Sequence, residues 1–230
     1  MAQHPLTLPE EVLLMVLTDR TGILLEETHY RYALGGAILA ELMLQGRVQL
    51  EPGTGQHLVT VTQPKATGDP VLDAALVQLV NATRRTNPEV WVGRFAEHDE
   101  LYLRVARQLC RKNALEEHEG RVRLIFRRTV YADLDPELRD DVMGRVRKAV
   151  FEDEASDVRT AFLTAFAGAG DILVKVFDAE KLISRMDHIR NIVKSAVDLT
   201  EEQRDQALEA ERAVLRATKE AVLSAEESVA

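Results

Sequence analysis

The strongest constraint on the fold is the nearly unbroken series of helical segments in the second half of the chain. The spacing of apolar residues there predicts four helices, over Pro136–Glu152, Ala155–Phe177, Ala179–Val197 and Glu201–Glu226. Aromatic residues make up only 5% of the chain, so a core between such helices must be built from aliphatic side chains. No linker rich in Pro, Gly or Ser divides the sequence. We therefore expect one mainly helical, all-α domain over residues 1–230, with residues 220–230 frayed.

The first half of the chain adds further helices and one or two small β-hairpins. Thr7 and Glu10 have the spacing of a capping box, and Pro9 suits the first turn of the helix that they begin. The same reasoning predicts helices over Tyr30–Gln45, Val71–Arg84 and Glu100–Lys112. Alternating patterns around turn residues predict hairpins over Val48–Val61 and Leu115–Val130, the second turning at His118–Gly120.

Helical periodicity also predicts which side chains form the core. The expected members are leucines that recur on one face of the predicted helices: Leu13, Leu14, Leu17, Leu39, Leu42, Leu76 and Leu109.

Composition excludes several classes of function. A formal charge of −9 argues against a chain whose whole surface binds nucleic acid or anionic lipid. The single cysteine, Cys110, excludes an internal disulfide and an all-cysteine metal cage, and the histidines lack metal-ligand spacing. We expect no catalytic residue, no metal and no cofactor. The apolar runs are too short to cross a bilayer and no signal peptide is evident, so we expect a soluble, cytoplasmic protein.

One segment carries a charge opposite to that of the whole chain. Between Leu101 and Tyr131, eight Lys or Arg stand against three acidic residues, a local charge of +5. Such a face could meet an anionic membrane surface, although it could also be a solvated face paired with acids elsewhere. The candidates for a lipid headgroup or membrane surface are Arg31, Arg104, Arg107, Arg111, Arg121, Arg123, Arg127 and Arg128.

The second predicted hairpin has an apolar side as well. Alternation places Val122, Leu124 and Phe126 on one face of the return strand and arginines on the other. The apolar face either packs on the core or forms a self-association edge, which would make the protein a homo-oligomer through the 115–130 hairpin.

A series of short motifs in the first 76 residues resembles the Golgi phosphoprotein 3 family. The resemblance is weaker after Arg104 but extends over nearly the whole chain. The matching motifs are Leu6–Leu8, Glu10–Leu14, Asp19-Arg20, Gly22, Glu41-Leu42, Leu44, Gly46-Arg47, Gln49–Glu51, Thr67–Asp69, Leu72-Asp73 and Ala75-Leu76.

This resemblance implies a mostly α-helical domain without catalytic activity, which binds phosphatidylinositol 4-phosphate at a membrane and gathers protein clients. It also implies a short member, compatible with a prokaryotic source. The family's headgroup-binding Trp and three Arg fall at Glu26, Gly35, Asp99 and Tyr102. An acidic residue repels a phosphate where an arginine would hold it. We therefore expect a peripheral membrane adaptor that has not retained the specific headgroup pocket.

A helix followed by a hairpin also outlines a winged helix, which keeps nucleic-acid binding as an alternative function. The net charge and the apolar character of Ala37–Leu44 argue against it, because a recognition helix needs polar side chains that reach base edges. The expected partners are weakly bound anionic membrane lipid at the inner face of a membrane, protein clients of unknown identity and a second copy of the chain. No nucleic acid is expected.

Overall fold

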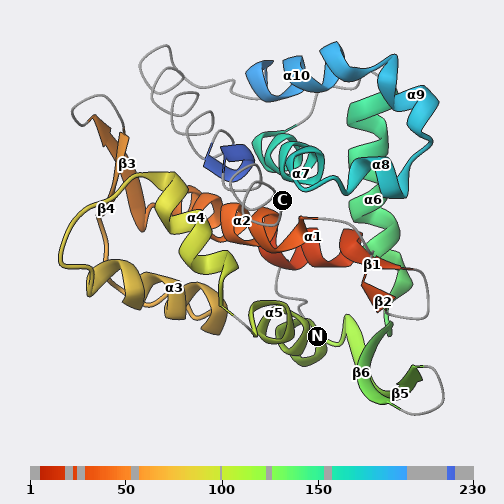
Figure 1. Cartoon of the computed structure of the whole chain (residues 1–230), viewed down its shortest axis with the longest axis horizontal. Coiled ribbons are helices and arrows are strands. Elements are labelled where there is room, and N and C mark those ends of the chain that lie inside the picture. The colour runs from red at the N-terminus through yellow and green to blue at the C-terminus, as the bar shows by residue number, and fades with distance from the viewer. Residues whose placement is uncertain are drawn as a thin grey trace.

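Two buried helices, α1 (Leu8–Val16) and α2 (Tyr30–Leu44), cross the centre of the molecule in the computed structural model of the chain (Figure 1). The structure describes residues 6–18, 23–24, 29–52, 57–98, 100–122, 126–152, 157–195 and 217–220. Helices α3 (Pro70–Val80), α4 (Pro88–Ala96) and α5 (Leu101–Arg111) lie on one side of the central pair, and α6 (Pro136–Phe151), α7 (Val158–Ala169) and α10 (Met186–Ser195) lie on the other. The mainly α-helical fold expected from the sequence is confirmed.

The first helix forms where its capping residues predict. The Glu10 carboxylate accepts a hydrogen bond of 2.6 Å from the backbone N–H of Thr7, and Pro9 lies in the first turn. Every residue of α1 is buried, including Glu10 and Glu11. The helix therefore cannot present a polar face to water and must satisfy its carboxylates inside the protein.

The second helix ends at a glycine, also as predicted. Gly46 has a φ of 65°, a conformation that a residue without a Cβ adopts readily. The backbone N–H of Gly46 donates to Met43 O, and that of Arg47 donates to Leu42 O. These bonds close the carbonyl end of α2 and direct the chain into the first long hairpin.

The layer formed by α3, α4 and α5 differs from the sequence-based prediction in two places. Helix α3 (Pro70–Val80) ends four residues before the predicted Arg84, because Asn81 and its neighbours turn away from the helix. Helix α4 (Pro88–Ala96) was not predicted at all. It starts from Asn87, whose side chain accepts from Val90 N, and it precedes α5 (Leu101–Arg111).

On the other side of the central pair, two of the helices predicted from the sequence are interrupted. Helix α6 (Pro136–Phe151) is confirmed, but the predicted helix Ala155–Phe177 is α7 (Val158–Ala169) followed by the short α8 (Leu173–Val176). Asp171 breaks it, with a φ of 57° that a helix cannot contain. The predicted helix Ala179–Val197 likewise divides into α9 (Ala179–Ile183) and α10 (Met186–Ser195).

The described residues form three two-stranded antiparallel sheets. Strands β3 (Val48–Pro52) and β4 (His57–Val61) confirm the first predicted hairpin, while β1 (Leu17–Thr18) and β2 (Ile23–Leu24) form a short pair that was not predicted. Strands β5 (Leu115–Val122) and β6 (Phe126–Asp133) confirm the second hairpin but correct its turn. His118–Gly120 is part of β5, because the pairing continues to Val122 opposite Phe126.

The predicted core is confirmed. All seven leucines expected to be buried are at most 2% exposed. The predicted C-terminal helix Glu201–Glu226 lies largely outside the described residues. Residues 217–220 are helical, and Thr218 and Phe166 lie so close to Gly36 on α2 that a Cβ there would collide with both.

Candidate functional site

Three arginines occupy one side of α5. Arg104, Arg107 and Arg111 are all exposed, and their spacing of three and four residues aligns them along a helix. Val105 and Leu109, on the other side of α5, are 0% exposed. Burial of that apolar side fixes the rotation of the helix, so these three residues, the α5 arginine stripe, face outward.

Two members of the stripe carry charges that no described residue neutralises by contact. The side chains of Arg104 and Arg107 form no hydrogen bond or ion pair with the described residues. Arg111 donates a hydrogen bond of 2.6 Å to Gln108 Oε1, which is a neutral acceptor. The stripe therefore presents positive charge to solvent.

Arg31 lies at the beginning of α2, close to the beginning of α5. The rings of Tyr30 and Tyr102 meet edge to face with centroids 6.5 Å apart, which joins these two helix ends. Arg31 is exposed, and its Nη2 lies 3.5 Å from the carbonyl oxygen of His98, just before α5. His98 and Arg104 in turn line one shallow hollow beside α3. The structure thus brings Arg31 to the amino-terminal end of the stripe.

The hairpin arginines are separate from this group. The strands β5 and β6 pair over eight residues each, so they form an arm of about 26 Å that extends from the helical body after α5 (Figure 1). Arg121 pairs with Arg127 and Gly120 pairs with Arg128 near the far end of the arm. Arg123 lies outside the described residues, as does Leu124, whereas Val122 and Phe126 form the last described pair.

Lys112, counted in the basic segment, faces inward instead of outward. Its Nζ lies 2.6 Å from Glu10 Oε2, and the side chain of Glu10 is only 1% exposed. The lysine therefore compensates a buried carboxylate of α1 and adds nothing to the exposed basic face. This contact also ties the end of α5, and with it the base of the arm, to the central helix.

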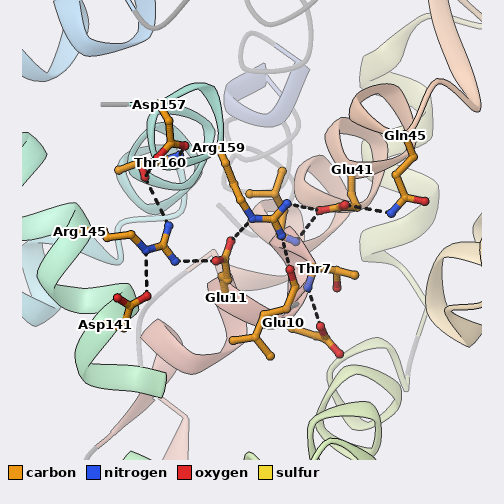
Figure 2. Close-up of polar contacts among 12 residues, drawn as sticks. Thr7, Glu10, Glu11, Glu41, Gln45, Asp141, Arg145, Asp157, Arg159 and Thr160 are labelled. Atoms are coloured by element: carbon orange, nitrogen blue, oxygen red, sulfur yellow. Dashed lines mark hydrogen bonds and ion pairs between the residues drawn. The ribbon is translucent and has the colours of Figure 1, made fainter. Parts of the chain in front are cut away.

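Lys112 lies at one edge of a buried polar network that connects four helices around α1. Figure 2 shows the part of this network that joins α1 to α2, α6 and α7. Glu11 lies 2.6 Å from Arg145 of α6 and 2.9 Å from Arg159 of α7. Arg159 also lies 3.1 Å from Glu41 of α2, and Glu41 accepts a hydrogen bond from Leu8 N. Each carboxylate thus meets a cation or a backbone donor, which a buried charge requires.

Burial dominates the electrostatics of these carboxylates. It raises the pKa of Glu10 above its ordinary value, although Lys112 acts in the opposite direction. Burial also raises the pKa of Glu11, more than Arg159 and Arg145 lower it. The cations therefore do not fully compensate the loss of hydration, and we interpret the network as a device that specifies how the helices meet rather than a source of large stability.

The described residues offer few other groups that could bind a metal ion or act as a nucleophile. They contain no group of three His, Cys, Asp or Glu close enough to hold a metal ion. Burial, with Glu117 and Glu116 nearby, raises the pKa of the half-buried Cys110, which disfavours its thiolate. Among the helices described, none combines the length and apolar character needed to span a membrane.

The sequence matches one known family over nearly its whole length. The family model described as Golgi phosphoprotein 3 (GPP34) matches residues 8–224. The chain belongs to the Golgi phosphoprotein 3 family. It is similar to vacuolar protein sorting-associated protein 74 of Schizosaccharomyces pombe, with 24% identity over 81% of this chain and 66% of the relative. The protein of the same name from Eremothecium gossypii is 44% identical over 31% of this chain and 24% of the relative. The chain therefore spans less than two thirds of each relative's length.

Two of the four family headgroup positions lie within the described residues. At Gly35, a Cβ would lie 2.7 Å from the backbone oxygen of Val92 and 3.5 Å from Phe95 Cβ. Helices α2 and α4 are therefore in backbone contact where the family resemblance places an arginine. Tyr102 packs on Tyr30, as described above, while Glu26 and Asp99 lie outside the described residues.

The buried network was not found from the sequence. Glu10 and Glu11 are adjacent acids in an otherwise apolar helix, which is a signal that they need internal partners. The partners Arg145 and Arg159 carry no comparable signal, because arginine on a helix is ordinarily exposed.

Proposed function

We propose that this protein is a non-enzymatic adaptor that attaches peripherally to the inner face of a membrane rich in anionic lipid. The observation that carries the proposal is the α5 arginine stripe, with Arg31 at its end, on a chain of net charge −9. Membership of the Golgi phosphoprotein 3 family supports it. The adaptor role is supported further by relatives that are named for vacuolar protein sorting.

The expected contact is weak and electrostatic. A basic residue close to an anionic leaflet contributes about 1 kcal/mol, and the field decays over a Debye length of about 8 Å at physiological salt. The stripe would thus contribute about 3 kcal/mol, with a further contribution from the arm when Arg121, Arg127 and Arg128 reach the same surface.

The proposal does not include recognition of one phosphoinositide. Glu26, Gly35, Asp99 and Tyr102 replace the aromatic and arginine positions of the family, and the close approach of α4 at Gly35 leaves no room for a longer side chain. We expect the protein to respond to surface charge, with no added preference for phosphatidylinositol 4-phosphate.

The arm is the proposed element for self-association. Strands β5 and β6 pair with each other, and within the described chain neither outer edge belongs to a larger sheet. An open strand edge can pair with a second copy of the chain. Val122, Leu124 and Phe126 remain the candidates for that contact.

Vesicle sedimentation tests the membrane proposal. Binding to vesicles of phosphatidylcholine with phosphatidylglycerol should fall at least tenfold in the triple variant R104Q/R107Q/R111Q, while vesicles of phosphatidylcholine alone should not bind the wild type. The matched control is K65Q/K181Q/K219Q, which removes three exposed lysines from other elements. Equal losses in both variants would contradict the proposal, as would salt-sensitive binding to duplex DNA without vesicle binding, the result that a winged helix predicts.

A further inference from the structure

A cavity of about 330 Å³ lies between the first long hairpin and the helices α3 and α4, away from the α5 arginine stripe. Its volume is at the lower end of the roughly 300–1,000 Å³ typical of small-molecule sites. Nine described residues line it, and most are apolar: Val59, Val61, Pro64, Leu79, Val80, Ala82, Arg84, Arg85 and Trp91. None of these nine is acidic.

The wall of this cavity contains a polar atom without a partner. Trp91 is 2% exposed, and its Nε1 has no hydrogen-bond partner. A buried donor left in this state costs about 1–3 kcal/mol. The hydroxyl of Thr86, in the same connection between α3 and α4, is also buried without a partner. The Nε1 atom is enclosed by the protein, so a molecule in the cavity does not reach it without a rearrangement.

Two arginine side chains also line this cavity, and they differ in whether they have an ion-pair partner. Arg85 lies 2.5 Å from Glu51 Oε2, so its charge is neutralised within the protein. Arg84 is exposed, and its side chain makes no hydrogen bond or ion pair with the described residues. The cavity thus combines an aliphatic wall with one cation that has no partner among the described residues.

We propose that this cavity binds a free aliphatic carboxylate, the class of molecule that includes fatty acids. The hydrocarbon chain would lie against Val59, Leu79 and Val80, with the carboxylate beside the guanidinium group of Arg84, which would balance its charge. A neutral amphiphile would leave the guanidinium uncompensated, and a short anion such as acetate would leave the aliphatic wall unfilled. The proposal is independent of the membrane role, because it uses none of the residues of the stripe or the arm.

Trp91 makes the test direct, because it is the only tryptophan in the chain. Decanoate, added to the full-length protein below the concentration at which decanoate aggregates, should give a saturable change in tryptophan fluorescence. Decanol and acetate should bind at least tenfold more weakly. The variant R84Q should raise the decanoate Kd about tenfold, because it removes the charged partner, whereas the matched control K181Q should leave the Kd unchanged.

A blocking variant tests the location. Val80 is 48% exposed, so V80F can extend into the cavity without overpacking the core, and it should abolish saturable binding. A82L serves the same purpose if V80F alters the circular dichroism spectrum. No saturable response to decanoate, equal affinity for decanol, or unchanged binding in the blocking variants would overturn the proposal. So would a fluorescence response to phosphatidylcholine vesicles without decanoate, because it would assign the cavity to bilayer lipid.

Discussion

Lys112 Nζ lies 2.6 Å from Glu10 Oε2, although 102 residues separate the two in the sequence. The pair joins the last turn of α5 to the first turn of α1, just before the chain leaves the helical body as the β5–β6 arm. The base of the arm is therefore anchored to α1 by a buried ion pair.

Removing the cation of this pair should destabilise the protein. In K112A the Glu10 carboxylate, 1% exposed, would lose its charged partner, and breaking a buried pair in this way costs about 3 kcal/mol or more. Urea unfolding measures the loss. The neighbouring R111A removes an exposed arginine and should change the free energy of unfolding by less than about 0.5 kcal/mol. Similar effects of the two variants would show that the Lys112 contact contributes little.

Two glycines on facing helices should respond in opposite ways to alanine. G35A places a Cβ 2.7 Å from the backbone oxygen of Val92, and such overpacking should cost about 1–3 kcal/mol. At Gly93, within α4, an added Cβ meets nothing within 4 Å, so G93A should stabilise by about 0.5–1 kcal/mol through lower chain entropy. Thermal unfolding of both variants separates close packing from helix propensity, and a stabilised G35A would rule out the α2–α4 contact.

Asp157, which caps α7, should make the stability depend on pH in the acid range. Burial alone would raise its pKa, but hydrogen bonds from Thr160 and the charge of Arg145 outweigh burial and lower it. The ionised carboxylate thus stabilises the fold above its ordinary pKa of 3.8, and this contribution is lost as the pH falls through the lower folded value. D157N keeps an acceptor but does not titrate. The stability difference between wild type and D157N should be constant near neutrality and should shrink below about pH 3.8; a difference that grows there would reverse the assigned direction of the shift.

Lipid selectivity should follow charge. In vesicles matched for total negative charge, the wild type should bind phosphatidylinositol 4-phosphate and phosphatidylglycerol within about twofold of each other, because the family resemblance places two headgroup-binding arginines at positions that are Gly35 and Tyr102 here. Sedimentation at equal lipid concentration measures this ratio. A clear preference for the phosphoinositide would mean that Arg31 and Arg104 form a headgroup pocket instead.

The arm can be tested without changing α5. Replacing Arg121, Arg123, Arg127 and Arg128 with Ser should remove up to about 4 kcal/mol of attraction to an anionic leaflet while leaving the helical fold intact. Vesicle binding should fall, and wild-type binding should decrease steeply as salt is raised. If the quadruple variant binds as the wild type does, or if salt has no effect, the arm does not contact the membrane electrostatically.

Local signals predicted the elements whose ends are determined by their own residues. The Thr7–Glu10 cap, the glycine after α2 and the period of α5 all lie within a few residues of the feature that they determine. Helix α4 was missed although Asn87 and Pro88 provide a recognisable start. The break before α8 is different, because it depends on a residue remote in sequence: His29 Nδ1 lies 3.0 Å from Asp171 Oδ2, and His29 N donates to Gly170 O.

In the candidate site, too, features determined by nearby residues were predictable, and features determined by remote residues were not. The exposure of Arg104, Arg107 and Arg111 follows from helical spacing against an apolar face, which a sequence shows directly. The inward position of Lys112 depends on Glu10, and nothing near Lys112 in the chain indicates that partner. The cavity around Trp91 was also invisible, because its walls come from a hairpin and two helices that meet only after folding.

The network around Glu11 also dictates an order of events during synthesis. Arg145 and Arg159 follow Glu11 by 134 and 148 residues. At the usual 5–20 residues per second, roughly 7 to 30 s pass between translation of Glu11 and translation of Arg159. A carboxylate cannot enter an apolar interior without its cations, so α1 must stay hydrated while most of the protein is still being made. Helix α1, which is translated before α6 and α7, is therefore fully enclosed only after both of them have been made.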